Sequence, residues 1–271
     1  MTKRAMRVHT PSFPLVTLSG IALLVSEKAE ALADNLENQF QPVADTSVLA
    51  VTEMVDVALR SFFMTPASKP KLTNPQEVQE AIRGLKVSKA LGPNSILNRA
   101  LKHLPQQAVS LLVLIFNTIL LTHHFPTAWK HAQVISILKL GKDPALPSSY
   151  RPISLLNMIG KLFEKILLAR ILHEVSKHGL MKDEQFGFRP RHSMSLQLAL
   201  LTERITRNFG KKRLTGTVFL NVAKAFNTVW NDGLLYELTL INFPSYIVHT
   251  ISSYLRGWMF EASFQMATSS C

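Results

Sequence analysis

The feature that most constrains the fold is a pair of long apolar helical patterns placed around two short β-branched segments. Residues 105–124 and 158–178 carry apolar side chains at helical spacing, and Gly179 ends the second pattern. Between them, "AQVISIL" and "YRPISLL" predict extended segments, because Pro152 biases Arg151 toward the β region. Strands scattered among helices predict a mixed, helix-rich α/β fold rather than a bundle or a sandwich.

The remaining elements are expected on either side of this region. The first 72 residues predict one helix ending near Phe40, followed by a linker, "MTPASKPKLTNP". The next helix has strong start signals, because Asn74 can cap it and Glu77 completes a capping box. Further on we expect a helix over 193–209, a strand at "TGTVFL", helices at "DGLLYELTLI" and "PSYIVHTISSYLRG", and a strand at "MFEASFQMA".

The charge balance indicates a polyanionic partner. Lys and Arg number 30 against 18 Asp and Glu, which gives a net charge of +12. Such an excess favours nucleic acid or an acidic membrane surface, and a protein that is merely basic is the alternative. The apolar run at 108–121 is too short to span a bilayer.

Cysteine usage and the N-terminus bear on the compartment. The one cysteine, Cys271, leaves no internal disulfide and no cysteine cluster for zinc, and the sequence contains no P-loop. We therefore expect an intracellular protein of the nucleus or cytoplasm, with no disulfide partner and no membrane. The first 33 residues can also be interpreted as a signal or transit sequence, which two prolines argue against.

Residues 217–230, "TVFLNVAKAFNTVW", have the outline of a metal-binding strand. β-branched and apolar residues lead to a polar side chain at Asn221, and a helix is expected after it. A metal site would require carboxylates here, yet the chain has Asn221 and Asn227.

Several stretches together resemble the reverse transcriptase of non-LTR (LINE-type) retrotransposons, most closely the jockey-like group. The most specific are "YRPISLL", "QFGFRP" and "FLNVAKAFNTVW", and the resemblance covers about residues 73–271. It implies polymerase fingers plus the first part of a ferredoxin-like palm, truncated. The corresponding division is 1–72 as N-terminal helix and linker, 73–214 as fingers, and 215–271 as the start of an incomplete palm.

The resemblance implies a nucleotide site formed by Lys139, Arg151 and Phe226. Lys139 and Arg151 correspond to fingers residues that meet the triphosphate of the incoming dNTP, for which a bidentate guanidinium is suited. A surface Lys and an Arg paired to a carboxylate are the alternative. Phe226 corresponds to the aromatic gate against a ribose 2′-OH, or else is a core aromatic.

The resemblance also implies contacts to the RNA template and DNA primer. Arg189 and Arg191 lie in the segment "QFGFRPR", which corresponds to residues near template and primer, where they would contact backbone phosphates. A plain solvated loop is the alternative.

The family's strand has acids at the positions of Asn221 and Asn227, and the first acid holds two Mg²⁺ ions. Two dications about 4 Å apart repel strongly and need nearby anions, whereas an amide supplies no charge. The family's other acids lie in a later Y-A-D-D hairpin, which these 271 residues do not contain. We therefore expect a catalytically inactive fragment that does not bind Mg²⁺.

Two rival functions stay open from the sequence. One is a basic module that binds nucleic acid without chemistry, and the other is an unrelated helical protein directed to a membrane or organelle.

For the fold, we expect the strand at residues 215–221 to have at most one neighbouring strand, "MFEASFQMA". We also expect proteases to cut residues 215–271, whereas residues 73–209 should be protected.

Overall fold

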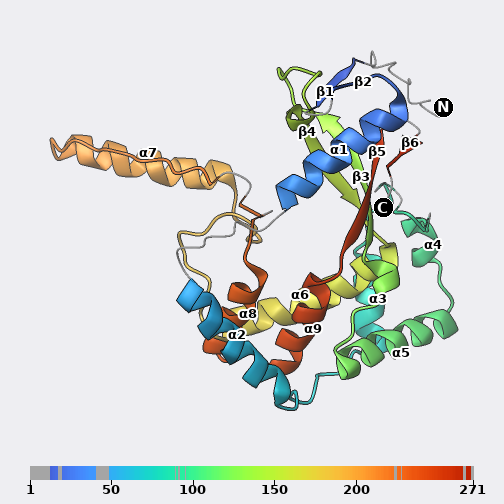
Figure 1. Ribbon diagram of the computed structural model, residues 1–271. Coiled ribbons are helices and arrows are strands. Elements are labelled where there is room, and N and C mark those ends of the chain that lie inside the picture. Colours follow the sequence, from blue (N-terminus) through green and yellow to red (C-terminus); the bar gives the residue numbers. More distant parts are fainter. Residues whose placement is uncertain are drawn as a thin grey trace. The chain divides into compact units, whose positions relative to one another are not determined.

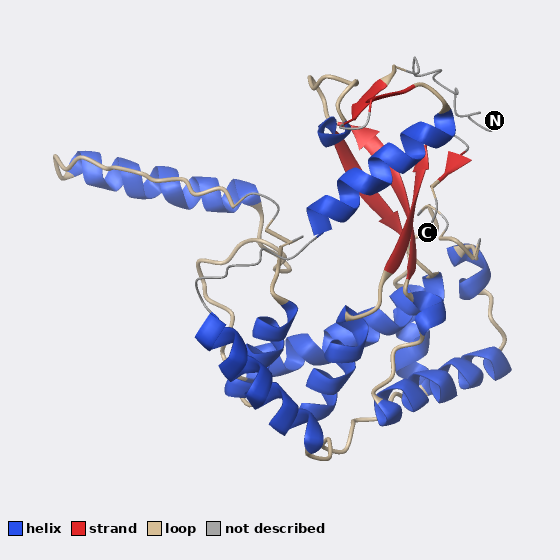
Figure 2. Cartoon of the chain, in the orientation of Figure 1, coloured by secondary structure: helices blue, strands red, loops and turns tan. Residues whose placement is uncertain are grey.

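A computed structural model shows a chain of helices with small sheets (Figures 1 and 2). It describes residues 13–17, 20–40, 49–88, 90, 92–94, 96–222, 225–226, 228–264 and 267–269. These form two compact units, unit 1 with residues 1–167 and 226–271, and unit 2 with residues 168–225. The predicted mixed, helix-rich α/β class is confirmed. The units divide the chain at positions inside the predicted fingers and palm, and that functional division stays a prediction.

The main sheet of unit 1 has the strand order β4-β3-β5-β6. Its strands are β3 (His131–Leu138), β4 (Tyr150–Leu155), β5 (Met259–Phe264) and β6 (Ala267–Thr268). β3 pairs antiparallel with β4 and parallel with β5, and β5 pairs antiparallel with β6. The predicted strands "AQVISIL" and "YRPISLL" are confirmed as β3 and β4.

Helix α1 (Val25–Phe40) covers one face of this sheet (Figure 2). Leu32 and Leu36 of α1 are buried with Val134 of β3 and Ala262 of β5 in one cluster. Residues with even numbers on β3 point to this helix, because side chains alternate along a strand. The odd-numbered face is left open, as the half-exposed Ile135 shows.

A helical core occupies the rest of unit 1. Its elements are α2 (Leu49–Met64), α3 (Pro75–Arg83), α4 (Asn98–Lys102), α5 (Gln106–Thr122), η2 (Thr127–Trp129), the first part of α6 (Met158–Lys177), α8 (Asn231–Leu240) and α9 (Ser245–Leu255). Aromatic rings fill the centre: Phe116 of α5 lies 5.4 Å from Phe163 of α6, centroid to centroid. Phe125 lies 5.0 Å from Tyr254 of α9, so the C-terminal helices pack into the same core.

Local start signals and close approaches position these elements. Asn74 Oδ1 accepts a hydrogen bond from the N–H of Glu77 at 2.8 Å, and Pro75 begins α3, so the predicted cap is confirmed.

Gly92 lies against the backbone that follows β4, and a Cβ there would stand 2.0 Å from the carbonyl oxygen of Leu156. The glycine therefore lets the "GPN" turn pack beside the β3–β4 hairpin.

Unit 2 consists of the end of α6, a loop and α7 (Met194–Gly210), followed by residues 211–222. Ser193 caps α7, because its hydroxyl accepts from the N–H of Leu196 at 3.2 Å. No residue of α7 is buried, and residues 211–222 have no secondary structure and are exposed throughout. Figure 1 shows these residues running back along α7.

Three predictions about elements are wrong. The first 72 residues contain, besides α1, a hairpin of β1 (Leu15–Thr17) and β2 (Gly20–Ala22) and the further helix α2. "TGTVFL" is not a strand. Its expected partner "MFEASF" is β5, which pairs with β3 instead. The reason is that β5 gains a central neighbour and the α1 cover, whereas a strand without cross-strand pairs has little stability of its own.

The expectation that all of 215–271 lies open is also wrong in the structure. Leu235 of α8, Ile247 and Val248 of α9, and Ala262 of β5 are completely buried. Among the described residues of this range, 215–222 are exposed throughout, as expected. In the part of the chain that the structure describes, no helix is long and apolar enough to cross a membrane.

Candidate functional site

The β3–β4 hairpin brings the predicted triphosphate residues together. Ile137 is the cross-strand partner of Arg151, and Lys139 lies two residues beyond Ile137. Because side chains alternate along a strand, Lys139 and Arg151 share one face, and this is the open face of the sheet. The fold thus places two cations as diagonal neighbours at the end of the hairpin.

The loop between the two strands is held by its own hydrogen bonds. The N–H of Lys139 donates to the carbonyl of Ser149 at 2.9 Å, and Lys139 Nζ donates to the carbonyl of Ser148 at 2.7 Å. Tyr150 Oη donates to the carbonyl of Pro144 at 2.9 Å. These bonds fix the stem of Lys139 and leave its ammonium two further N–H donors for another acceptor.

Arg151 is exposed, and among the described residues no Asp or Glu forms an ion pair with it. A guanidinium presents five N–H donors in a fixed fork that fits phosphate oxygens. The exposed Lys142 adds a third cation in the same loop. The arrangement is able to bind a polyphosphate chain at the open face of the hairpin.

The predicted metal position lies in the exposed stretch of unit 2. Asn221 is exposed and belongs to no strand, and Phe226, which falls in unit 1, is 77% exposed. Asn227 lies outside the described residues. The exposed ring of Phe226 does not take the role of a core aromatic in this structure.

The donor set around Asn221 does not fit a pair of Mg²⁺ ions. Between Glu203 and Asp232 the sequence has six Lys and Arg and no Asp or Glu. The described residues contain no group of three or more His, Cys, Asp or Glu that could hold a metal ion. Mg²⁺ needs carboxylates or phosphates to balance its charge, and an exposed amide among cations supplies none.

Arg189 stabilises the predicted template loop through contacts within the loop. One guanidinium nitrogen donates to the carbonyl of Lys182 at 2.9 Å, and the other lies 3.5 Å from Asp183 Oδ1. Arg191 is exposed, with a positive φ of 62°, and no described residue hydrogen-bonds its side chain. The two arginines therefore differ: Arg191 is free to contact a phosphate, whereas Arg189 first has to leave its loop contacts.

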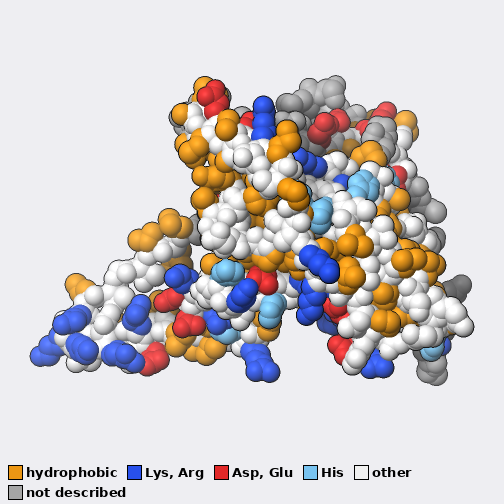
Figure 3. Space-filling view, turned by 90° about the horizontal axis from the view of Figure 1, so that it is seen from below, with side chains coloured by type: hydrophobic (Ala, Val, Ile, Leu, Met, Phe, Trp, Pro, Cys, Tyr) orange, Lys and Arg blue, Asp and Glu red, His pale blue; other side chains and the backbone are white. Residues whose placement is uncertain are grey.

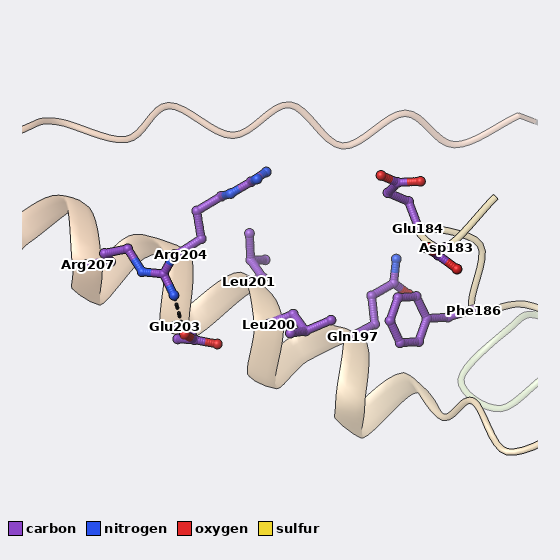
Figure 4. A pocket seen from close by; sticks show the side chains of 9 residues that line it. All are labelled: Asp183, Glu184, Phe186, Gln197, Leu200, Leu201, Glu203, Arg204 and Arg207. Carbon is purple, nitrogen blue, oxygen red and sulfur yellow. Dashed lines mark hydrogen bonds and ion pairs between the residues drawn. The ribbon is translucent and has the colours of Figure 1, made fainter.

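A groove of about 440 Å³ lies between this loop and α7 (Figure 4). Arg207 turns back to Glu203 in an ion pair on its floor. The residues that line it are Asp183, Glu184, Phe186, Gln197, Leu200, Leu201, Glu203, Arg204 and Arg207. Acidic and basic side chains both line the groove, so it is not a site for anions alone.

The strongest concentration of positive charge was missed by motif reasoning. Unit 2 has eleven Lys and Arg against four Asp and Glu, a net of +7 out of the chain's +12. Figure 3 shows Lys and Arg side chains gathered on the arm formed by α7 and the turn after it. We define the basic arm as the exposed cations of this region: Arg204, Arg207, Lys211, Lys212 and Arg213. A windowed charge count along the sequence would have found it.

The sequence is similar to known polymerases. The family model for reverse transcriptase (RNA-dependent DNA polymerase) matches residues 137–270. The RNA-directed DNA polymerase from mobile element jockey of Drosophila funebris is 35% identical over 267 residues, which are 97% of this chain and 28% of that protein. The jockey polymerase of Drosophila melanogaster is 34% identical over 264 residues, again 97% and 28%.

The fold, the basic hairpin and these similarities define the class: the chain belongs to the reverse transcriptases. Within that class its sequence is similar to the polymerases of non-LTR retrotransposons of the jockey-like group. The chain spans a little over a quarter of the length of these relatives. Reverse transcriptases as a family bind an RNA template, a DNA primer and dNTPs and use divalent metal ions.

Proposed function

We propose that this chain binds nucleic acid without sequence preference and does not polymerise DNA. The observation that carries the proposal is the chemistry around Asn221. An exposed amide stands at the family's metal position, within a 28-residue stretch that has cations and no acids. Two-metal phosphoryl transfer requires negative charge at that point, whereas a phosphate backbone requires positive charge.

We propose two binding surfaces, one in each unit. Unit 1 contributes Lys139 and Arg151 on the open face of the hairpin, the proposed triphosphate site. Unit 2 contributes Arg191 and the basic arm, which would contact template or primer phosphates. Phe226 is the proposed residue beside the sugar, and Mg²⁺ is not part of the proposed bound state. We expect such a protein to act in the nucleus or cytoplasm.

The test is binding of a fluorescein-labelled, unstructured RNA by anisotropy at several NaCl concentrations. Each cation that contacts a phosphate contributes about 0.7 to the slope of log K against log salt on single strands. Replacing Lys211, Lys212 and Arg213 by Gln should therefore weaken binding and flatten the slope by roughly 2.

The matched control is a variant with three exposed cations of unit 1 replaced, Lys69→Gln, Arg83→Gln and Lys86→Gln. It removes the same net charge away from the proposed surface. An equal loss of affinity in both triple variants would show that net charge alone drives binding. Binding that is absent at low salt would remove the proposed function altogether.

A further inference from the structure

Two histidines from distant parts of the sequence meet inside unit 1. His123 ends α5 and His249 lies in the middle of α9, and their ring centroids are 5.2 Å apart with 48° between the planes. His123 has a left-handed backbone, with a φ of 55°. Non-glycine residues adopt this conformation uncommonly, and the ring of His123 contacts His249 of α9.

Phenylalanine rings from α2 enclose one side of the pair. Phe62 lies 5.5 Å from the ring of His249, and Phe63 lies 4.9 Å from it in an edge-to-face contact. Within this enclosure, Nδ1 of His123 and Nε2 of His249 are buried and have no hydrogen-bond partner among the described residues. Buried polar atoms are nearly always paired, so two unpaired nitrogens in contacting rings are candidates to bind a common ligand.

Both imidazoles lie in a poorly solvated environment. Burial lowers the pKa of both His123 and His249, and the nearby His123 lowers the pKa of His249 further. In the described structure, neither pKa is shifted by a carboxylate, a lysine or an arginine.

The ring spacing fits a shared metal ion. With a metal–nitrogen distance of about 2.0–2.1 Å, each ring centre stands about 3.2 Å from the metal, and a tetrahedral angle then places the two centres about 5.2 Å apart. The observed separation is 5.2 Å. We propose that His123 and His249 form a two-imidazole site for a divalent transition metal ion such as Zn²⁺.

The ligand type sets the class of metal and the strength of the site. Nitrogen ligands select Zn²⁺, Cu²⁺, Ni²⁺ or Co²⁺ over Mg²⁺ and Ca²⁺, which prefer oxygen. No third His, Cys, Asp or Glu joins the pair among the residues that the structure describes. Water therefore fills the remaining positions. The site ties α5 to α9 and is separate from the proposed nucleotide surface.

The experiment is a titration of the full chain with Zn²⁺ by calorimetry, after dialysis against a chelator. The two test variants are chosen to keep the fold. His249→Phe preserves an aromatic ring against Phe62 and Phe63, and His123→Asn keeps a residue that tolerates a left-handed backbone. The matched control is His124→Ala, which removes the adjacent, exposed imidazole.

We expect the wild type and His124→Ala to bind one Zn²⁺ each, and each test variant to bind at least tenfold more weakly. Zn²⁺ should also raise the Tm of the wild type and leave the Tm of both test variants unchanged. Loss of binding in His124→Ala alone, or unchanged binding in both test variants, overturns the proposal.

If both test variants unfold, X-ray absorption spectroscopy of the Zn²⁺-loaded wild type tests whether two imidazoles coordinate the ion. Two imidazole rings in the coordination shell support the site, and one or none contradicts it. A wild-type chain that is folded but binds no Zn²⁺ also overturns the proposal.

Discussion

Arg151 stands directly across from Ile137 in the β3–β4 register, on the face of the sheet that α1 does not cover. The half-exposed Ile153 lies on the same face, and among the described residues no Asp or Glu forms an ion pair with the guanidinium. The hairpin therefore presents one arginine and the adjacent Lys139 to an incoming anion.

Replacing Arg151 with Ala should weaken binding of inorganic tripolyphosphate about tenfold, because a hydrogen bond to a charged group contributes about 1.5 kcal/mol or more. Arg151→Lys should lose less affinity, since lysine keeps the positive charge but lacks the planar, bidentate guanidinium. Calorimetric titration measures both. The control is Arg99→Ala, another exposed arginine of unit 1. Equal affinity for Arg151→Ala and Arg99→Ala would remove Arg151 from the site.

Gly92→Ala should destabilise unit 1 by about 1–3 kcal/mol, the usual range for overpacking. The new Cβ meets the Leu156 carbonyl oxygen at 2.0 Å, so backbone has to shift. The matched control is Gly210→Ala at the end of α7, where a Cβ meets nothing within 4 Å. That substitution should be neutral or slightly stabilising, because Ala favours helices. Urea unfolding of both variants checks the contrast, and equal effects would contradict the close approach.

Glu164→Gln should increase the free energy of unfolding at neutral pH, and the increase should be smaller at acidic pH. Burial raises the pKa of Glu164, although a hydrogen bond from Tyr254 Oη, at 3.3 Å, opposes the rise. The folded state therefore holds this proton more tightly than the unfolded chain does, so Glu164 lowers stability as pH rises from its ordinary pKa through the raised one. Below the ordinary pKa, wild type and variant should be alike. A stability difference that is the same at pH 4 and pH 7 would contradict this linkage.

The sequence predicts the local features well and the long-range ones poorly. The Asn74 cap and the strand bias at Pro152 depend on neighbouring residues, and both are present in the structure. The parallel pairing of β5 with β3 depends on the whole fold, because paired residues such as His131 and Met259 are 128 positions apart in the sequence. "TGTVFL" has strand composition, but composition does not supply a partner strand.

The same distinction holds for the candidate sites. Family motifs in the sequence point to Lys139 and Arg151, whose placement at the same end of the sheet follows from one hairpin. The loop contacts of Arg189 are not visible in a motif, because they depend on how residues 182–189 fold back. His123 and His249 are 126 residues apart and meet only through the packing of α5 against α9. Spacing rules applied to neighbouring histidines could not find that pair.

Limited trypsin digestion should cut first after Lys211, Lys212 or Arg213, since these residues are exposed and lack secondary structure. Lys130 should resist, because it is 6% exposed and its Nζ donates to the carbonyls of Ser253 and Arg256 at 2.7 and 2.9 Å. The two fragments should remain together in gel filtration, since both contribute to the core of unit 1. Release of the C-terminal fragment would contradict the packing of α8, α9 and β5.

The most direct test of the central claim is primer extension on an RNA template that the same sample is shown to bind at low salt. Reactions contain dNTPs with Mg²⁺ or Mn²⁺, and an active reverse transcriptase on the same template serves as the positive control. We predict retained binding and no extension by the wild type, because Asn221 supplies no charge for the metal ions. Asn221→Asp should not extend either, because one carboxylate does not complete a two-metal site and these 271 residues contain no Y-A-D-D sequence. Extension by the wild-type chain above a no-protein control would contradict the account.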